Sequence, residues 1–306
     1  MHRPVLLEAV LDGLAIKPDG IYIDGTFGRG GHSRGILQHL GPDGRLIALD
    51  KDPEAIIIGE TEPFRDPRFC MVHCSFAQLE KVVQSRGYLG KVNGVLLDLG
   101  VSSPQLDEAK RGFSFRKDGP LDMRMDLQQT MDATTWINQA SEAEISRVIF
   151  ELGEERFARR IAREIVKARE EKPISRTLQL AEVVTKACPT REVKKHPATR
   201  TFQAIRIFIN HELEDLREVL PQSLGVMAKG GRLCVISFHS LEDRIVKQFI
   251  SKEVRGADIP RDIPIKDEER RHRLRKIGSL IRPNYAEVES NPRARSARLR
   301  IAEKIS

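Results

Sequence analysis

Four short apolar runs in the first hundred residues alternate with amphipathic segments, and this alternation constrains the fold more than any other feature of the sequence. The runs read GIYIDGTF, GRLIALDKD, RFCMVHCSF and VNGVLLDLG, and each ends in polar residues or glycine. Helices are predicted between them, near residues 31–40, 53–60 and 76–86. A chain that alternates strand and helix builds a parallel sheet covered by helices, so the sequence predicts an α/β domain.

The alternation stops after the fourth run. Residues 105–200 contain no convincing strand, only turn-forming residues followed by helical segments. One helix is predicted from Thr201, the strand RLCVISF follows it, and KIGSLIR and SARLRIAEKI predict an antiparallel hairpin at the sheet edge. Charged residues with prolines predict a loop over 254–275. Three segments are therefore predicted: the first part of the α/β domain at 1–107, an all-helical insert at 108–200, and the second part of the domain at 201–306.

Composition narrows the class of protein. The chain has 306 residues, 40% of them hydrophobic, yet no run approaches the roughly 18 apolar residues that a membrane span requires. The N-terminus lacks a signal-peptide pattern, so we predict a cytoplasmic protein with no membrane partner. Reduced thiols are predicted for the scattered cysteines, and no metal is expected, because Cys70 and Cys74 have no second ligand pair to complete a zinc site.

Positive charge is concentrated near the C-terminus. The formal net charge is +7, and residues 252–306 contain 15 Lys/Arg against 9 Asp/Glu, which gives +6 for that segment. A basic flank of this kind favours a polyanionic partner such as nucleic acid. Solvated charge without a partner is the plain alternative.

The stretch 22-YIDGTFGRGGHS-33 contains the end of the first apolar run and the glycine-rich turn directly behind it. A glycine-rich turn at this point lets the backbone approach a ligand, and the next helix offers free N–H groups. A nicotinamide dinucleotide would require G-x-G-x-x-G, but Ser33 replaces the third glycine after Gly28 and Gly30, so the match is weak. A tight turn without a ligand is the other alternative.

S-adenosylmethionine fits the same turn better. Asp24 ends the first predicted strand, where it can meet the ammonium group of that ligand. Asp50 ends the second strand, where a carboxylate can accept hydrogen bonds from a ribose diol. Phe76, just after the third strand, is placed to contact the adenine. In the usual acid-x-G-x-G-x-G signature, Thr26 stands in place of the first glycine.

The fourth strand ends in 95-VLLDLGVSSPQLD-107. Enzymes that methylate amino groups carry a short acid- or Asn-containing loop with proline here, which accepts hydrogen bonds from the target NH2. Asp98, Ser102 and Ser103 are predicted to take that role. The Asp-Pro-Pro-aromatic form of DNA amino-methyltransferases is absent, so a DNA substrate is disfavoured.

This loop, together with 111-RGFSF-115, 119-GPLDMRMD-126, 196-HPATRTFQAIRI-207, 236-ISFHSLEDRIVK-247 and 291-NPRARSA-297, closely resembles the bacterial RsmH (MraW) family over nearly the whole chain. The resemblance implies a class I, Rossmann-like S-adenosylmethionine-dependent methyltransferase domain interrupted by a helical insert that recognises RNA. It implies N4-methylation of a cytosine in the P-site decoding region of 16S rRNA. The implied partner is 16S rRNA or the small ribosomal subunit, and monomer and homodimer both remain open.

The resemblance also implies cofactor contacts for residues of the glycine turn and of the strand ends: Gly30, Gly31, His32, Asp50, Phe76, Asp98 and Gln105. Among residues after the fifth strand, Ser237, His239 and Ser240 are predicted to hold the target base, His239 as a catalytic residue. A Ser-His-Asp hydrolase is disfavoured because no G-x-S-x-G elbow surrounds Ser240.

An RNA-contacting face is predicted on the helix after the insert. This face contains Arg200, Gln203 and Arg206, which are three residues apart and therefore lie on one side of the helix. A solvated polar face without a partner is the alternative. Two other classes of protein stay open at this point: a nicotinamide oxidoreductase, and an RNA-binding protein that keeps the fold without turnover.

Overall fold

The computed structural model describes residues 4–189, 196–256 and 272–306, and the chain divides into two compact units. Unit 1 comprises Met1–Gly100 and Leu213–Ser306, and unit 2 comprises Val101–Glu212. The helical segment therefore begins earlier and ends later than the predicted 108–200. Most of the loop predicted over 254–275 lies outside the described residues.

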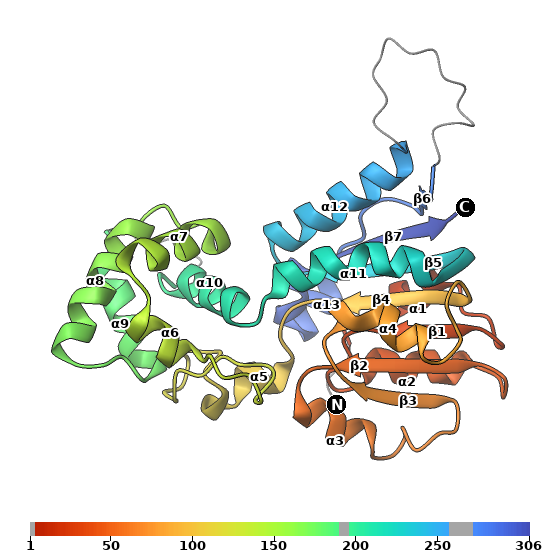
Figure 1. Cartoon of the computed structure of the whole chain (residues 1–306), viewed down its shortest axis with the longest axis horizontal. Coiled ribbons are helices and arrows are strands. Elements are labelled where there is room, and N and C mark those ends of the chain that lie inside the picture. Colours follow the sequence, from red (N-terminus) through yellow and green to blue (C-terminus); the bar gives the residue numbers. More distant parts are fainter. Residues whose placement is uncertain (1–3, 190–195, 257–271) are drawn as a thin grey trace, which may run out of the picture. The chain divides into compact units, whose positions relative to one another are not determined.

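Unit 1 contains a seven-stranded sheet with the order β3-β2-β1-β4-β5-β7-β6 (Figure 1). The strands are β1 (Ile21–Asp24), β2 (Arg45–Asp50), β3 (Phe69–His73), β4 (Val92–Asp98), β5 (Met227–Ser237), β6 (Leu274–Lys276) and β7 (Arg298–Lys304). The first five are parallel, which confirms the predicted parallel sheet.

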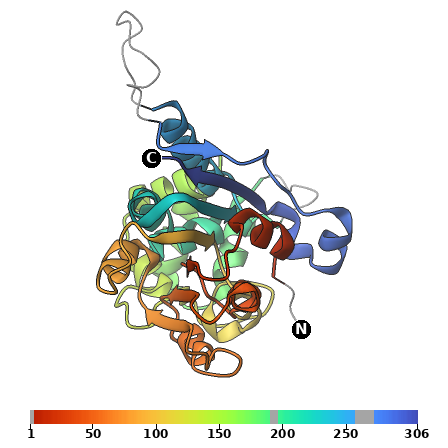
Figure 2. The same ribbon diagram turned by 90° about the vertical axis from the view of Figure 1, so that its right-hand side faces the viewer.

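The last two strands form an antiparallel edge that continues the sheet beyond β5 (Figure 2). The predicted hairpin was wrong in detail. KIGSLIR contributes only Lys276 to β6 and an isolated bridge from Ile281 to Leu299. Helix α13 (Tyr285–Ser290) and the turn η4 (Pro292–Ser296) stand between the two strands, so the connection is not tight.

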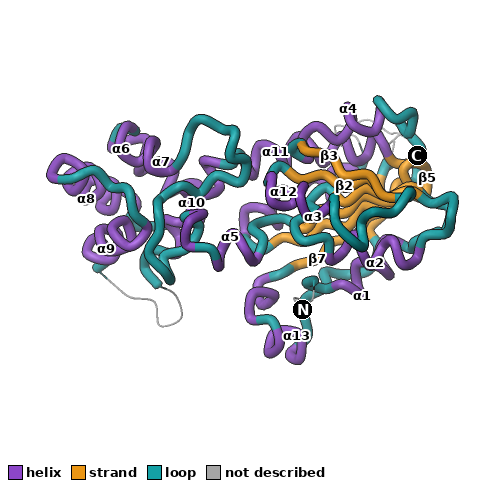
Figure 3. The backbone as a smooth tube through the Cα atoms, turned by 90° about the horizontal axis from the view of Figure 1, so that it is seen from below, coloured by secondary structure: helices purple, strands orange, loops and turns teal. Residues whose placement is uncertain are grey.

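Helices cover both faces of the sheet of unit 1 (Figure 3). One face packs against α4 (Leu79–Gln84), α11 (Glu212–Val226) and α12 (Ser240–Arg255), and the other packs against α1 (Leu7–Leu14), α2 (Gly31–His39) and α3 (Pro53–Gly59). Along β4, Val95 and Leu97 face the first layer while Leu96 faces the second. Strands buried on both faces read as continuous apolar runs, which is why they could be predicted.

Unit 2 is built from helices around its own apolar core. The helices are α5 (Ser103–Asp107), α6 (Ala133–Gln139), α7 (Glu142–Gly153), α8 (Ala158–Glu171), α9 (Thr177–Ala187) and α10 (Thr199–Ile209). Among its described residues the β pairing is limited to an isolated bridge between Pro120 and Arg176. The single helix predicted from Thr201 is in fact two, because His211 adopts a left-handed conformation (φ 53°) between α10 and α11. Helix α10 packs on α7, so it belongs to unit 2.

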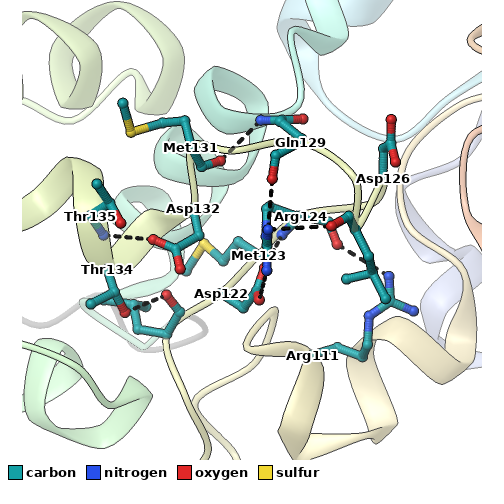
Figure 4. Close-up of polar contacts among 12 residues, drawn as sticks. Arg111, Asp122, Met123, Arg124, Asp126, Gln129, Met131, Asp132, Thr134 and Thr135 are labelled. Carbon is teal, nitrogen blue, oxygen red and sulfur yellow. Dashed lines mark hydrogen bonds and ion pairs between the residues drawn. The ribbon is translucent and has the colours of Figure 1, made fainter.

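Polar contacts hold the irregular segment between α5 and α6 (Figure 4). The Arg124 guanidinium pairs with both carboxylate oxygens of Asp122 at 2.8 Å and donates to the Gln129 carbonyl at 2.6 Å. The buried Arg111 donates to the Arg124 carbonyl at 3.1 Å. Burial raises the pKa of Asp122, but the hydrogen bonds from Arg124 outweigh it and hold this pKa below its usual value. Most of the block 119-GPLDMRMD-126 is therefore used to order its own backbone.

Candidate functional site

Three acids gather at the carboxyl edge of the sheet in unit 1. Asp24, Asp50 and Asp98 are the last residues of β1, β2 and β4, and β1 lies between the other two strands. The strand order reverses between β1 and β4. Ligands of open α/β sheets bind at such a reversal, beyond the carboxyl ends of the strands.

The turn after β1 requires its glycines. Gly28 and Gly30 have φ angles of 55° and 69°, a left-handed conformation that glycine adopts without steric cost. A Cβ on Gly30 would lie 2.2 Å from the Phe64 ring, and one on Gly31 would lie 2.3 Å from the side chain of Pro4. Gly28 donates its N–H to Asp50 at 2.7 Å, so β2 fixes the turn.

Thr26 connects the ends of β1 and β4. Its hydroxyl accepts a hydrogen bond from the Asp98 N–H at 2.6 Å, and its own N–H donates to Asp24 at 3.1 Å. A glycine at this position, as in the usual signature, would lack the hydroxyl. Sequence analysis missed this role of Thr26, although its departure from the signature was the available signal.

Asp24 is 1% exposed, and both of its carboxylate oxygens are engaged. The second oxygen accepts from the Ser33 hydroxyl at 2.7 Å, and burial raises the pKa of the carboxyl. Asp24 therefore holds the turn and the first turn of α2 together. Its contact with a ligand ammonium group stays a prediction.

Asp50 and Phe76 lie where the sequence analysis placed them, Asp50 at the end of β2 and Phe76 after β3. The Asp50 oxygens accept from the N–H groups of Gly28 and Asp52, and burial raises its pKa to about 6. Each carboxylate oxygen can accept a further hydrogen bond, as a ribose diol would require. Phe76 begins the turn η1 (Phe76–Gln78) and is half-buried beside the core.

His32 and Asp98 form a pair at the centre of this edge. His32 is 6% exposed, and its Nε2 lies 3.0 Å from the Val5 carbonyl oxygen. Because a carbonyl can only accept, Nε2 carries the hydrogen. Nδ1 faces Asp98 Oδ2 at 3.6 Å, and a proton on one of these two atoms makes the contact favourable.

The other Asp98 oxygen is the most informative atom of the site. Oδ1 is buried and has no hydrogen-bond partner among the described residues. Burial raises the pKa of Asp98 to about 6, His32 lowers it, and the charges of Asp24 and Glu242 raise it further. A buried, unpartnered carboxylate oxygen is costly without a donor or a cation, so this atom fits a ligand that brings one.

The residues after β5 have structural contacts. Ser237 is 2% exposed and donates to the Arg298 carbonyl at 3.4 Å. His239 is the N-cap of α12, where its Nδ1 accepts from the Glu242 N–H at 3.4 Å. Asp243 pairs instead with Arg298 and Arg300 from β7. The Ser-His-Asp arrangement is therefore absent from these residues, and the hydrolase alternative is rejected.

Several predicted site residues belong to unit 2. Ser102 precedes α5 and donates its N–H to the Gln105 side chain at 2.9 Å, while Ser103 is the first residue of that helix. Gln105 is 5% exposed.

The predicted RNA-contacting residues of α10 also have partners within unit 2. The Arg206 guanidinium pairs with both oxygens of Glu212 at 2.7 and 2.8 Å. Arg200 donates to the Glu154 carbonyl, and Gln203 donates to the Leu152 carbonyl. Their contact with RNA is not tested by these observations and stays a prediction.

The described residues contain no cluster of three or more His, Cys, Asp or Glu side chains able to hold a metal ion. The cysteines Cys70, Cys74, Cys188 and Cys234 are free thiols. No helix in the described ranges has the length and apolar character needed to cross a membrane.

The strand order β3-β2-β1-β4-β5-β7-β6, with β7 antiparallel to β5 and a glycine turn and acids at the order reversal, is that of a class I, Rossmann-like methyltransferase domain. A family model described as the MraW methylase family matches residues 1–305, and the chain belongs to this family. It is therefore a methyltransferase that uses S-adenosylmethionine, which excludes the nicotinamide alternative.

The sequence relatives agree with this assignment. The chain is 66% identical over 305 residues to the ribosomal RNA small subunit methyltransferase H of Coxiella burnetii, covering 100% of this chain and 99% of the relative. It is 56% identical over 310 residues to the protein of the same name from Thioalkalivibrio sulfidiphilus, covering 100% and 98%.

Proposed function

We propose that the protein transfers the methyl group of S-adenosylmethionine to N4 of a cytosine in the decoding region of 16S rRNA, in the cytoplasm. Asp98 carries this proposal. It offers a buried carboxylate oxygen, without a hydrogen-bond partner among the residues that the structure describes, at the sheet edge where the cofactor of a class I methyltransferase binds. The names of the relatives support ribosomal RNA as the substrate.

The cofactor, when bound, supplies an electrophilic methyl group on a sulfonium. Its ribose diol is proposed to bind Asp50, and its adenine is proposed to contact Phe76. The glycine turn and His32 are proposed to border the amino-acid end of the cofactor, and Asp24 is proposed to meet its ammonium group. Gln105 is proposed as a further contact. Each of these residues except Gln105 belongs to unit 1.

Methyl transfer forms one N–C bond and breaks one C–S bond, and the bonding pair stays on sulfur. The N4 lone pair of cytosine is delocalised into the ring, so the nitrogen must be oriented before it can attack. Asp98 Oδ1 can accept a hydrogen bond from N4–H, which favours a pyramidal nitrogen in the transition state. The proton that N4 loses passes to this acceptor or to solvent.

The target base must leave its stack to reach the cofactor. Ser102 and Ser103 are proposed to help orient the amino group. Contacts that hold the target base are proposed for Ser237, the last residue of β5, and for His239 and Ser240, which follow it. Contacts with the RNA backbone are proposed for Arg200, Gln203 and Arg206 on helix α10.

Transfer of a labelled methyl group to purified RNA tests the proposal. Small ribosomal subunits and protein-free 16S rRNA, both from cells that lack this gene, are incubated with the protein and labelled cofactor. Mass spectrometry of the digested RNA is expected to show N4-methylcytidine in the decoding region. Label on another base, or at another atom of cytosine, would contradict the proposal.

A further inference from the structure

Helix α8 in unit 2 has one buried and one charged face. Ala158, Ile161, Ala162 and Ile165 lie in the core at helical spacing, where α8 packs against α7 and α9. The exposed cations are Arg159, Arg160, Arg163 and Lys167, which we name the α8 cation face. At 100° per residue these four side chains fall within one arc of the helix.

The cations of this face have no carboxylate within ion-pair distance among the described residues. Arg160 and Glu164 are four residues apart, as are Lys167 and Glu171, which would permit pairing along the helix. The helix forms neither pair, although ion pairs are common elsewhere, as between Arg147 and Glu151 on α7. Arg163 is four residues from both Arg159 and Lys167, and like charges four residues apart weakly destabilise a helix. Helix stability therefore does not explain this arrangement of cations.

The direction of the helix strengthens this conclusion. The first turn of α8 contains no acid, and no side chain caps its N-terminus. The acids Glu170 and Glu171 are at the other end. Cations near the N-terminus and acids near the C-terminus both oppose the helix dipole. Arg159 and Arg160 in the first turn therefore oppose the helix dipole and favour a negatively charged partner, whereas Arg169 in the last turn complements the dipole.

We propose that the α8 cation face binds the phosphate backbone of the RNA substrate. This inference rests on the proposed function and identifies a surface of unit 2 through which that RNA is held. Arg159 and Lys167 are separated by about 12 Å along the helix axis, long enough to meet several successive phosphates. Three of the four residues are arginines, whose planar guanidinium groups match phosphate with two hydrogen bonds.

The surface differs from the one that sequence spacing had suggested. On α10 the guanidinium of Arg206 is committed to Glu212, whereas the α8 cations are available to phosphate. A membrane surface is a poorer fit. A helix that binds a bilayer exposes an apolar face, and the apolar face of α8 is buried in the core of unit 2.

Salt-dependent binding tests this surface in the full-length protein. The probe is a fluorescein-labelled fragment of 16S rRNA that contains the decoding region. The variant combines Arg159→Gln, Arg163→Gln and Lys167→Gln. Its matched control removes three exposed lysines of unit 1, with Lys17→Gln, Lys81→Gln and Lys229→Gln, so that both proteins have the same net charge.

The α8 variant is expected to bind the fragment about 10-fold or more weakly near 0.15 M salt. The slope of log Kd against log salt should fall by about 2–3, because each lost phosphate contact removes about 0.7–0.9. The control should keep the wild-type slope. An unchanged slope in the α8 variant overturns the proposal. So does a variant that keeps its RNA affinity but no longer binds anionic phospholipid vesicles.

Two further measurements separate the possible failures. If the triple variant melts below the wild type, the single variant Arg163→Gln replaces it, with an expected slope change of about 1. Wild-type protein that fails to methylate the RNA contradicts the proposed function. Wild-type methylation combined with equal RNA affinity of variant and wild type contradicts the α8 surface alone.

Discussion

At the scale of single residues, the proposed reaction depends on Asp98 at the end of β4. Asp98 donates its backbone N–H to the Thr26 hydroxyl, faces His32 through one carboxylate oxygen and leaves the other oxygen buried. Asp98→Asn keeps the shape of the side chain and removes its charge. The single-turnover methylation rate at saturating cofactor is expected to fall by about 10²–10³, the usual cost of losing one well-placed electrostatic contact.

A purely structural Asp98 would give a different result. The Tm of Asp98→Asn would then fall, while the rate in the folded fraction would stay near normal. RNA affinity serves as the control, since phosphate contacts dominate it and are expected to stay unchanged. A thermal melt beside the rate measurement decides between the two roles.

The pH dependence of the reaction should also report Asp98. Its pKa lies at about 6, raised chiefly by burial. Protonation removes the negative charge and leaves a weaker acceptor, so kcat/KM should fall as pH drops through about 6, by up to about ten-fold per unit. This loss should be absent in Asp98→Asn.

The effect of the same group on stability has the opposite sign. A carboxyl with a raised pKa in the folded state binds its proton more tightly there than in the unfolded chain. Its contribution to stability is present below the unfolded value of 3.8 and is lost as pH rises through about 6. Acidification to pH 5.5 should therefore not lower the Tm through Asp98. If the Tm falls together with kcat/KM as the pH is lowered, unfolding, and not protonation of Asp98 in the folded protein, causes the loss of rate.

At the scale of elements, the N-terminus of α12 connects stability with the proposed base contact. His239 caps this helix, and the Glu242 carboxylate accepts from the N–H groups of Phe238 and His239. His239→Ala should lower the free energy of unfolding by about 0.5–2 kcal/mol, the usual cost of a lost cap. His239→Asn supplies another cap and should restore stability but not the methylation rate. Full recovery of the rate in His239→Asn would reduce His239 to a cap.

Elements could be predicted from the sequence where a local pattern determined them. The parallel strands are apolar on both faces, and their carboxyl ends must meet, so Asp24, Asp50 and Asp98 could be placed together from sequence alone. The break between α10 and α11 could not, because it depends on the left-handed backbone of His211 inside an otherwise helical pattern. The Thr26 to Asp98 contact joins residues far apart in the sequence and depends on side-chain geometry.

At the scale of the whole molecule, net charge alone does not show which cations are available to a polyanion. The sequence places most of the excess positive charge near the C-terminus. Several of those cations are paired in unit 1: Arg298 and Arg300 with Asp243, and Arg275 with Glu303. The α8 cations, which have no carboxylate partner in the part of the chain that the structure describes, belong to unit 2 and were not apparent from the charge count. Pairing, which needs coordinates, decides which charges are available.

The two units have separate cores, so unit 2 should fold by itself. Every residue of its core lies between Phe113 and Ile209, including Trp136, which is the only tryptophan in the sequence. A fragment of residues 101–212 is expected to unfold cooperatively, with tryptophan emission and helical circular dichroism changing at one temperature. Ile161→Ala, at a fully buried position, should destabilise the fragment by about 2–5 kcal/mol, whereas Leu178→Ala, at a 40% exposed position, should cost much less. Non-coincident transitions, or equal effects of the two substitutions, would show that unit 2 needs unit 1 to form its core.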